Sequence, residues 1–284
     1  MIVIESPRVR EPRELADEVL ELASGRPLAI ATDFDGTISD LVENPDAAVL
    51  REDGREALVA LSRTCSILVS SGRRLDDLMR RVPLDSVALA GEHGGDLFLP
   101  AGRFFRAKLT PEAAETLASF RELARRILAG TNGFVERKRL ATAAHTRRVP
   151  EAERIALERT LAREAIALAR PGLVEPVIGK MVVELRVPGA SKEAALWRFA
   201  GSLSRETLLV ALGDDVTDED LFRGANAVGG LSIKVGPGRT CARRALHAPS
   251  DVGAFLGGLA AGRSVDLLSS HRGAWGASVQ RRES

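Results

Sequence analysis

Three short apolar runs in this chain each lead directly into a cluster of polar residues. The clusters occupy residues 33–37, 70–73 and 213–218. A short and continuously apolar run indicates a strand that is covered on both faces, as in a parallel sheet. Ligands bind beyond the carboxyl ends of the strands in such sheets. We therefore expect the three clusters to meet at one edge of a sheet.

The alternation of strand and helix patterns is interrupted in the middle of the chain. Residues 108–187 carry the patterns of a helix, two strands, a second helix and two more strands, which make a self-contained α/β unit. The patterns on either side, in 1–107 and 188–284, alternate as in an open parallel sheet. The prediction is an α/β fold in which a Rossmann-like parallel-sheet core carries 108–187 as an inserted domain, with a loose tail from about residue 263.

Bulk composition argues against several classes of protein. The 284 residues include 40 basic and 39 acidic ones, and a formal charge of +1 gives no general attraction for nucleic acid or for a membrane surface. No segment approaches the ~18 apolar residues of a membrane helix, and the start shows no leader pattern. Cys65 and Cys241 lack metal-ligand spacing and are expected to be thiols rather than a disulfide. We predict a cytoplasmic protein that binds neither nucleic acid nor membrane, and its oligomeric state is left open.

Asp33 and Asp35 lie two residues apart, where the first apolar run opens into a turn. Asp-Gly is common turn chemistry, so this pair alone indicates no more than a turn. A second acidic cluster, 213–220, also follows an apolar run and strengthens the functional interpretation. Thr217 and Asp220 fit a capping box there and suit the start of a helix. The other acids of the cluster need a different partner.

Asp214 and Asp215 precede that helix and are left without a structural role. Carboxylates that meet from separate strands repel each other, and Mg²⁺ takes one or two carboxylates together with substrate phosphate oxygens. Side chains suited to hold phosphate follow the same strands or begin a helix: Thr37, Ser71 and Lys192. A carboxylate beside Mg²⁺ can attack phosphorus, and a second, protonated carboxyl can give its proton to the leaving oxygen. These residue types indicate Mg²⁺-dependent phosphoryl transfer.

The same residues resemble a known superfamily. Asp33-Phe34-Asp35-Gly36-Thr37 is similar to motif I of the haloacid-dehalogenase-like hydrolases, and motifs II, III and IV are matched at Ser71, Lys192 and 213–215. More narrowly, the chain resembles the trehalose-6-phosphate phosphatases from residue 28 to about 260. The segments that carry this resemblance are 71–73, 91–94, 136–138, 145–147, Gly179-Lys180 with Glu184, and 213–222.

The resemblance implies a role for each acid. Asp33 would be the nucleophile and Asp35 the general acid and base, while Ser71 and Lys192 would hold phosphate. The Mg²⁺ ligands would be Asp33, the backbone carbonyl of Asp35 and Asp214, with Asp215 or Asp218 in support. The inserted unit would be an α/β cap that closes over a sugar.

The inserted unit carries polar side chains at alternating positions, as one face of a strand does. The pairs that share a face are Glu136 with Lys138, His145 with Arg147, and Lys180 with Glu184. A solvated sheet face shows the same pattern, but the resemblance makes these residues the binders of sugar hydroxyls. It adds Arg73, Glu92 and His93 from the core. The chain departs from the family pattern at Glu193, Thr146 and Phe34.

We therefore expect a hydrolase of trehalose biosynthesis, which converts trehalose 6-phosphate to trehalose and phosphate through an aspartyl phosphate. Another sugar phosphate is the alternative substrate: sucrose phosphate, a mannosyl phosphate or a glycosylglycerate phosphate. Two further classes fit less well. A non-catalytic sugar-phosphate sensor has no need of both Asp33 and Asp35, and a haloacid dehalogenase has no use for a metal corner at Asp214 and Asp215.

Overall fold

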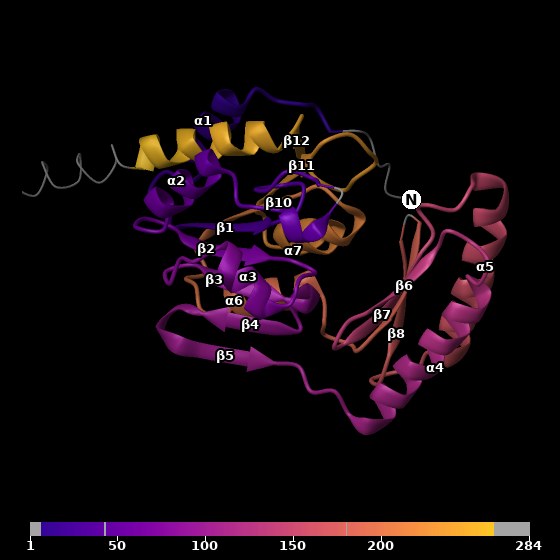
Figure 1. The fold of residues 1–284 in the computed structure, drawn as a ribbon. Helices are drawn as coiled ribbons and strands as arrows, with labels where there is room; N and C mark the ends of the chain where they lie inside the picture. The colour runs from indigo at the N-terminus through magenta and orange to yellow at the C-terminus, as the bar shows by residue number, and fades with distance from the viewer. Residues whose placement is uncertain (1–6, 43, 180, 264–284) are drawn as a thin grey trace, which may run out of the picture.

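The computed structural model describes residues 7–42, 44–179 and 181–263, and it contains two sheets (Figure 1). The larger sheet consists of β1 (Leu28–Asp33), β2 (Ser66–Ser70), β3 (Ala88–Gly91), β4 (Asp96–Leu99), β5 (Arg103–Arg106), β10 (Leu208–Gly213), β11 (Leu231–Val235) and β12 (Arg244–Leu246). Its strand order is β12-β11-β10-β1-β2-β3-β4-β5. The six strands from β12 to β3 pair in parallel, and β4 and β5 continue the sheet antiparallel.

Helices cover both faces of this sheet, which is why its central strands are mainly apolar. All six residues of β1 are buried. One face packs against α1 (Pro12–Leu22), α2 (Glu52–Leu61), α3 (Leu75–Arg81) and the helix at 249–263. The other face packs against α6 (Lys192–Ala200) and α7 (Glu219–Ala227). The predicted Rossmann-like parallel core is confirmed.

The smaller sheet is formed between β5 and α6 in the chain. Its strands are β6 (Phe134–Arg137), β7 (Ala141–His145), β8 (Glu175–Gly179) and β9 (Val182–Arg186), in the antiparallel order β6-β7-β9-β8. Two helices, α4 (Pro111–Ile127) and α5 (Glu151–Leu168), cover one face only (Figure 1). Phe120 and Leu161 pack there against Val183 and Leu185. The opposite face, which holds the polar alternating positions, is left uncovered by helices and is turned toward the core.

The end of the core differs from the sequence expectation. The alternating pattern after residue 235 indicates only helix in this segment, whereas the chain forms the edge strand β12 and then one helix, 249–263. The three residues of β12 are too few to show an alternating pattern, so only their parallel pairing with β11 identifies them. Cys65 and Cys241 are free thiols. Within the described residues, no helix has the length and apolar character to cross a membrane.

Candidate active site

The three polar clusters meet at one edge of the larger sheet. β10, β1 and β2 are neighbours in parallel, with Thr32 paired to Leu212 and Asp33 paired to Ser70. Asp33 ends β1, Ser71 follows β2, and Asp214 follows β10. The predicted convergence of the clusters is confirmed.

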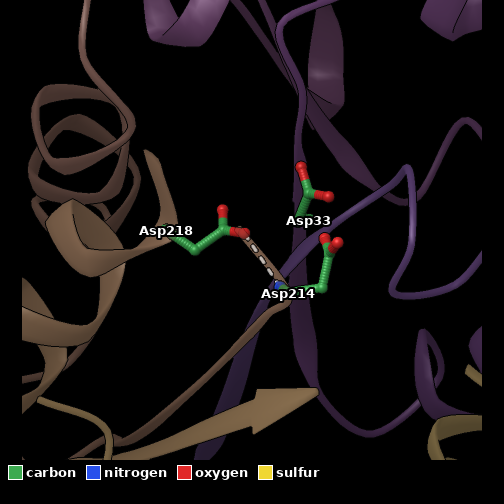
Figure 2. Close-up of side chains that lie close together, drawn as sticks. All are labelled: Asp33, Asp214 and Asp218. Carbon is green, nitrogen blue, oxygen red and sulfur yellow. Dashed lines mark hydrogen bonds between the residues drawn. The ribbon is translucent and has the colours of Figure 1, made fainter. Parts of the chain in front are cut away.

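Three carboxylates form the centre of this edge. Asp33, Asp214 and Asp218 offer oxygens that all lie within 4.8 Å of one another (Figure 2). Burial raises the pKa of Asp33 well above its usual value; Lys192 opposes this, whereas Asp218 and Asp214 add to it. Burial and the charge of Asp218 raise the pKa of Asp214 to about 6. Three carboxylates so close together repel one another, and a cation among them removes that repulsion.

The oxygens of this cluster differ in what they are free to bind. Oδ2 of Asp218 accepts the backbone N–H groups of Asp214 at 2.9 Å and Asp215 at 3.0 Å. Its Oδ1 accepts the Lys192 ammonium at 2.5 Å. Asp33 uses Oδ1 toward Lys192, and Asp214 uses Oδ1 toward the hydroxyl of Thr37 at 3.3 Å. Oδ2 of Asp33 and Oδ2 of Asp214 have no hydrogen-bond donor in the described part of the chain, so they remain available to a cation.

Asp215 lies outside the three-carboxylate cluster. Its side chain is exposed, and it is the N-cap of η4 (Val216–Asp218), a 3-10 turn that precedes α7. The capping box of this turn joins Asp215 and Asp218, so the predicted box of Thr217 and Asp220 was wrong. The reason is that the helical backbone begins with a 3-10 turn, whose N-cap lies two residues before the predicted one.

Lys192 places its ammonium between two of the acids. It begins α6, where the side chain of Ser191 accepts the N–H of Ala194 at 3.1 Å and caps the helix. Burial disfavours the charged form, but the carboxylates of Asp218 and Asp33 outweigh it and raise the pKa of Lys192 above its usual value. The lysine therefore remains a cation although it is 3% exposed.

Gly36 allows the two acidic segments to approach each other. Its φ of +79° lies in the left-handed region, which disfavours residues with a Cβ. A Cβ at this position would lie 2.3 Å from Oδ2 of Asp214. The turn after β1 thus needs glycine both for its backbone and for the space that Asp214 occupies.

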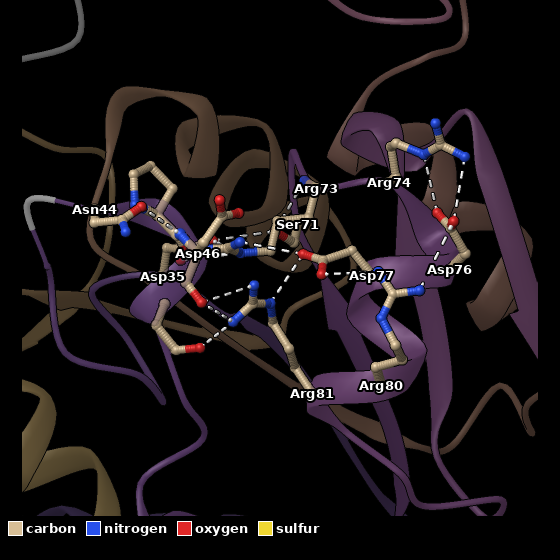
Figure 3. A network of polar contacts seen from close by, with 12 residues as sticks. Asp35, Asn44, Asp46, Ser71, Arg73, Arg74, Asp76, Asp77, Arg80 and Arg81 are labelled. Atoms are coloured by element: carbon tan, nitrogen blue, oxygen red, sulfur yellow. Dashed lines mark hydrogen bonds and ion pairs between the residues drawn. The ribbon is translucent and has the colours of Figure 1, made fainter.

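Asp35 is held away from this cluster by Arg73. Nε and Nη2 of the guanidinium donate to the two carboxylate oxygens of Asp35 at 2.6–3.1 Å (Figure 3). Ser71 donates to Oδ2 of Asp35 at 3.4 Å and accepts the backbone N–H of Arg73 at 3.1 Å. Arg73 also donates to Asp77 and to the carbonyl of Pro45. Its guanidinium, which was expected to bind substrate, is therefore occupied by the protein itself.

The polar face of the smaller sheet meets the core at Lys138. Its ammonium donates to Oε2 of Glu184 at 3.0 Å and to Nε2 of His93 at 2.7 Å, with Oε2 of Glu136 at 3.9 Å. Burial opposes the charge of Lys138, but Glu184 and Glu136 raise its pKa above the usual value. Burial and the lysine lower the pKa of His93 to about 3. His93 is therefore neutral and accepts the hydrogen bond through Nε2.

Strained backbone fixes His93 beneath this lysine. Glu92 and His93 have φ of 53° and 54°, in the left-handed region that residues other than glycine rarely adopt. Their N–H groups donate to the carbonyls of Arg73 at 2.7 Å and Ser71 at 3.0 Å, which hold this conformation. A Cβ on Gly72 would lie 2.7 Å from the His93 ring. Such strain persists where surrounding contacts enforce it, and it concentrates at functional sites.

The remaining predicted residues of the inserted unit differ in placement. Oε2 of Glu136 accepts a hydrogen bond from Nε2 of His145 at 2.9 Å, on the polar face. Arg147 is exposed in the turn after β7, and no polar contact joins it to the rest of the described chain. Its predicted place on the strand face beside His145 was wrong, because β7 ends at His145. Lys180 lies outside the described residues.

The three departures from the family pattern all point away from the cluster of acids. Thr146 is fully buried and donates to Glu158 of α5 at 2.6 Å, on the helix side of the sheet. Glu193 accepts a hydrogen bond from the indole of Trp197 one turn along α6. Phe34 is buried in the core, with the Arg73 guanidinium 5.6 Å from its ring centroid.

A cleft joins the core residues to those of the smaller sheet. Its volume is about 1370 Å³, and its lining includes Asp35, Arg73, Glu92, His93, Glu136 and Lys138. Pockets for small molecules measure about 300–1,000 Å³, so the cleft has room for one. The three-carboxylate cluster is not part of this lining. The residues that line the cleft from the turns after β1 and β2 are Asp35 and Arg73.

Comparison with known proteins gives consistent results. Residues 31–251 match the family model described as trehalose-phosphatase. A trehalose-phosphate phosphatase of Mycobacterium tuberculosis is 36% identical over 259 residues, which cover 86% of this chain and 64% of that protein. An uncharacterized glycosyl hydrolase of the same organism is 33% identical over 259 residues, covering 87% of this chain and 19% of that protein. The chain thus spans less than two thirds of the length of these relatives.

A solved structure supports the fold. The C-terminal domain of trehalose-6-phosphate phosphatase from C. albicans has a TM-score of 0.77 and 23% identity. The match covers 91% of this chain and 99% of that one. At this level of identity the likeness concerns the fold alone.

Proposed function

The chain belongs to the trehalose-phosphatase family, and from this we propose that it is a phosphatase that hydrolyses trehalose 6-phosphate to trehalose and phosphate. One observation carries the proposal. Asp33 and Asp214 each keep one oxygen free at the sheet edge, and the buried ammonium of Lys192 donates to the other oxygen of Asp33, an arrangement that suits a phosphate group and a cation. The polar face of the smaller sheet lies across the cleft, where it suits a sugar.

The donor set fits Mg²⁺. Asp33 and Asp214 would hold the ion with the backbone carbonyl of Asp35, because each acid keeps one oxygen free of hydrogen bonds. Asp218 would support them, since its carboxylate orients Lys192 and the N–H of Asp214. When bound, Mg²⁺ supplies positive charge that stabilises the phosphoryl oxygens during transfer.

Asp33 then acts as the nucleophile. Its carboxylate attacks phosphorus, the bond from phosphorus to the sugar oxygen breaks, and the phosphoryl group becomes an ester of Asp33. Lys192 and Ser71 hold phosphoryl oxygens during the transfer. Asp35 gives a proton to the departing sugar oxygen and then takes one from the water that releases phosphate from Asp33.

The smaller sheet and its two helices form a cap that recognises the sugar. Glu136, Lys138 and Glu184 share its uncovered polar face, and Lys138 reaches the core through His93. Other sugar phosphates offer similar hydroxyls, so sucrose phosphate, mannosyl phosphate and glycosylglycerate phosphate are the alternative substrates. The cap residues decide among these, because the groups at the sheet edge act on the phosphoryl group and its ester oxygen, which all of these substrates share.

The test is phosphate release from a panel of sugar phosphates. Trehalose 6-phosphate is expected to have the highest kcat/KM, and Asp33→Asn is expected to abolish turnover of every substrate because an amide does not attack phosphorus. A higher kcat/KM for another sugar phosphate would replace the substrate but keep the chemistry. Turnover by Asp33→Asn within a few-fold of the wild type would show that Asp33 is not the nucleophile.

A further inference from the structure

Asp77 joins two arginines that the mechanism above leaves without a task. It lies in the first turn of α3, and its Oδ2 accepts Nη1 of Arg73 at 3.2 Å and Nε of Arg81 at 2.9 Å (Figure 3). The side chains of Arg73 and Arg81 are 12% and 13% exposed. Burial raises the pKa of Asp77, but the two arginines outweigh it and hold the pKa below the usual value. Asp77 is therefore a fixed anion between two largely buried cations.

Both arginines reach from Asp77 toward the catalytic turn. Arg73 grips Asp35 with two donors and also donates to the carbonyl of Pro45 at 2.7 Å. Arg81 donates to the carbonyls of Asp46 and Ala48. The network thus ties α3 to the turn that carries Asp35 and to the segment at 44–48.

The simpler explanation for Asp77 is that acids favour the first turn of any helix. Asp76, its neighbour, fits that explanation: its side chain is 57% exposed and pairs with Arg74 and Arg80 on the solvent side. Exposed pairs of this kind contribute little. Asp77 differs because it accepts a hydrogen bond from Arg73, and the guanidinium of Arg73 also binds the carboxylate of Asp35.

The two-donor pair fixes the plane of the Arg73 guanidinium relative to the Asp35 carboxylate, but it does not fix the pair relative to the rest of the protein, because both side chains have rotatable bonds. Asp77 and the Pro45 carbonyl supply the further contacts that do. We propose that Asp77 is a positioning residue, which holds Arg73 in the orientation that places the Asp35 carboxyl for proton transfer to the leaving oxygen. This rests on the proposed phosphatase activity and adds a residue to it.

The proposal predicts a dependence on the leaving group. Phenyl phosphate needs a proton on its departing oxygen, whereas the p-nitrophenolate ion leaves without one. In Asp77→Asn, kcat/KM for phenyl phosphate is expected to fall about ten-fold or more, because a general acid that is out of position loses part of its catalytic effect. The kcat/KM for p-nitrophenyl phosphate is expected to stay within about two-fold of the wild-type value. The assay uses the full chain at saturating Mg²⁺, with the unfolding temperature of each variant measured.

Asp76→Asn is the matched control, because it removes the same charge one residue away without contact with Arg73. It is expected to leave both esters unchanged. The double variant Arg73→Gln/Asp77→Asn should be no slower than Arg73→Gln alone, because Asp77 acts through Arg73. If Asp77→Asn unfolds below the assay temperature, Asp77→Glu takes its place, since the added methylene shifts the guanidinium.

Three results would overturn the proposal. They are an equal fall for both esters, a phenyl phosphate rate unchanged by Asp77→Asn, and the same contrast in Asp76→Asn. If the wild type releases phosphate from neither ester nor from any sugar phosphate, the proposed function itself is wrong.

Discussion

Glu184→Gln separates recognition of the sugar from transfer of the phosphoryl group. Glu184 lies on β9, is 8% exposed and accepts the Lys138 ammonium at 3.0 Å. The amide keeps the shape of the side chain but removes its charge. If Glu184 binds a sugar hydroxyl, the substitution turns a hydrogen bond to a charged group, worth about 1.5–3 kcal/mol, into a neutral one worth about 0.5–1.5 kcal/mol, a loss of about 1–1.5 kcal/mol. At about 1.4 kcal/mol for each factor of ten, kcat/KM for trehalose 6-phosphate falls roughly 5- to 13-fold.

The same substitution also weakens the cap. Removing one partner of a buried ion pair costs about 3–5 kcal/mol of stability when the other charge is left unpaired. Lys138 keeps Glu136 at 3.9 Å and the neutral ring of His93, and the new amide oxygen still accepts a hydrogen bond. We therefore expect a smaller loss, about 1–3 kcal/mol, measured by urea unfolding.

The assay compares trehalose 6-phosphate with p-nitrophenyl phosphate, which offers no hydroxyls. Hydrolysis of the second ester should barely change in Glu184→Gln. Glu175→Gln is the matched control, because Glu175 lies on the neighbouring strand and pairs with Arg186 at 2.8 Å instead of Lys138. An equal fall in kcat/KM for both esters, with the fold intact, would refute the assignment of the cap as the part that recognises the sugar.

Three further predictions follow from the site. Chelator-treated protein should be inactive and should regain activity with Mg²⁺. The ion should also raise the unfolding temperature of the wild type but not that of Asp214→Asn. Full activity without metal would contradict the scheme. Gly36→Ala should abolish turnover and weaken Mg²⁺ binding in calorimetry because a Cβ meets Asp214 at 2.3 Å, whereas Gly25→Ala, with nothing within 4 Å, should lose neither. The pKa of His93 is about 3 when folded and 6.5 in the unfolded chain, so the folded state binds fewer protons there and stability falls as pH drops below about 6.5. Urea unfolding of the wild type should thus lose about 2 kcal/mol more between pH 7 and pH 5 than that of His93→Gln; equal losses would show that His93 does not titrate as described.

The parts of the fold that could be predicted are those with a local pattern. β1 and β10 are uninterrupted apolar runs because both faces are covered, and this made them visible in the sequence. β5 was not predicted, since all four of its residues are exposed and only pairing with β4 defines it. Arg147 was misplaced because the pattern of alternation continues past the residue where β7 ends.

The sequence could predict which residues belong to the site, but not which of their side chains pair with one another. The acids stood out because each follows an apolar run. The choice between Asp215 and Asp218 as support depends on η4, whose 3-10 turn has no sequence signal distinct from a helix start. The pairing of Arg73 with Asp35 depends on the spacing of two strands, and α3 carries Asp77 where any helix carries an acid. Those contacts belong to the tertiary structure.

The order of strands in the larger sheet also constrains how the chain is made. β1 pairs with β10, so the central strand waits for a partner about 180 residues later in synthesis. The smaller sheet uses only strands between residues 134 and 186, in antiparallel pairs of short sequence separation. Local contacts form quickly and distant ones slowly. On the ribosome, the cap can therefore become ordered while one edge of β1 is still open, and that apolar edge is where an interrupted chain would aggregate.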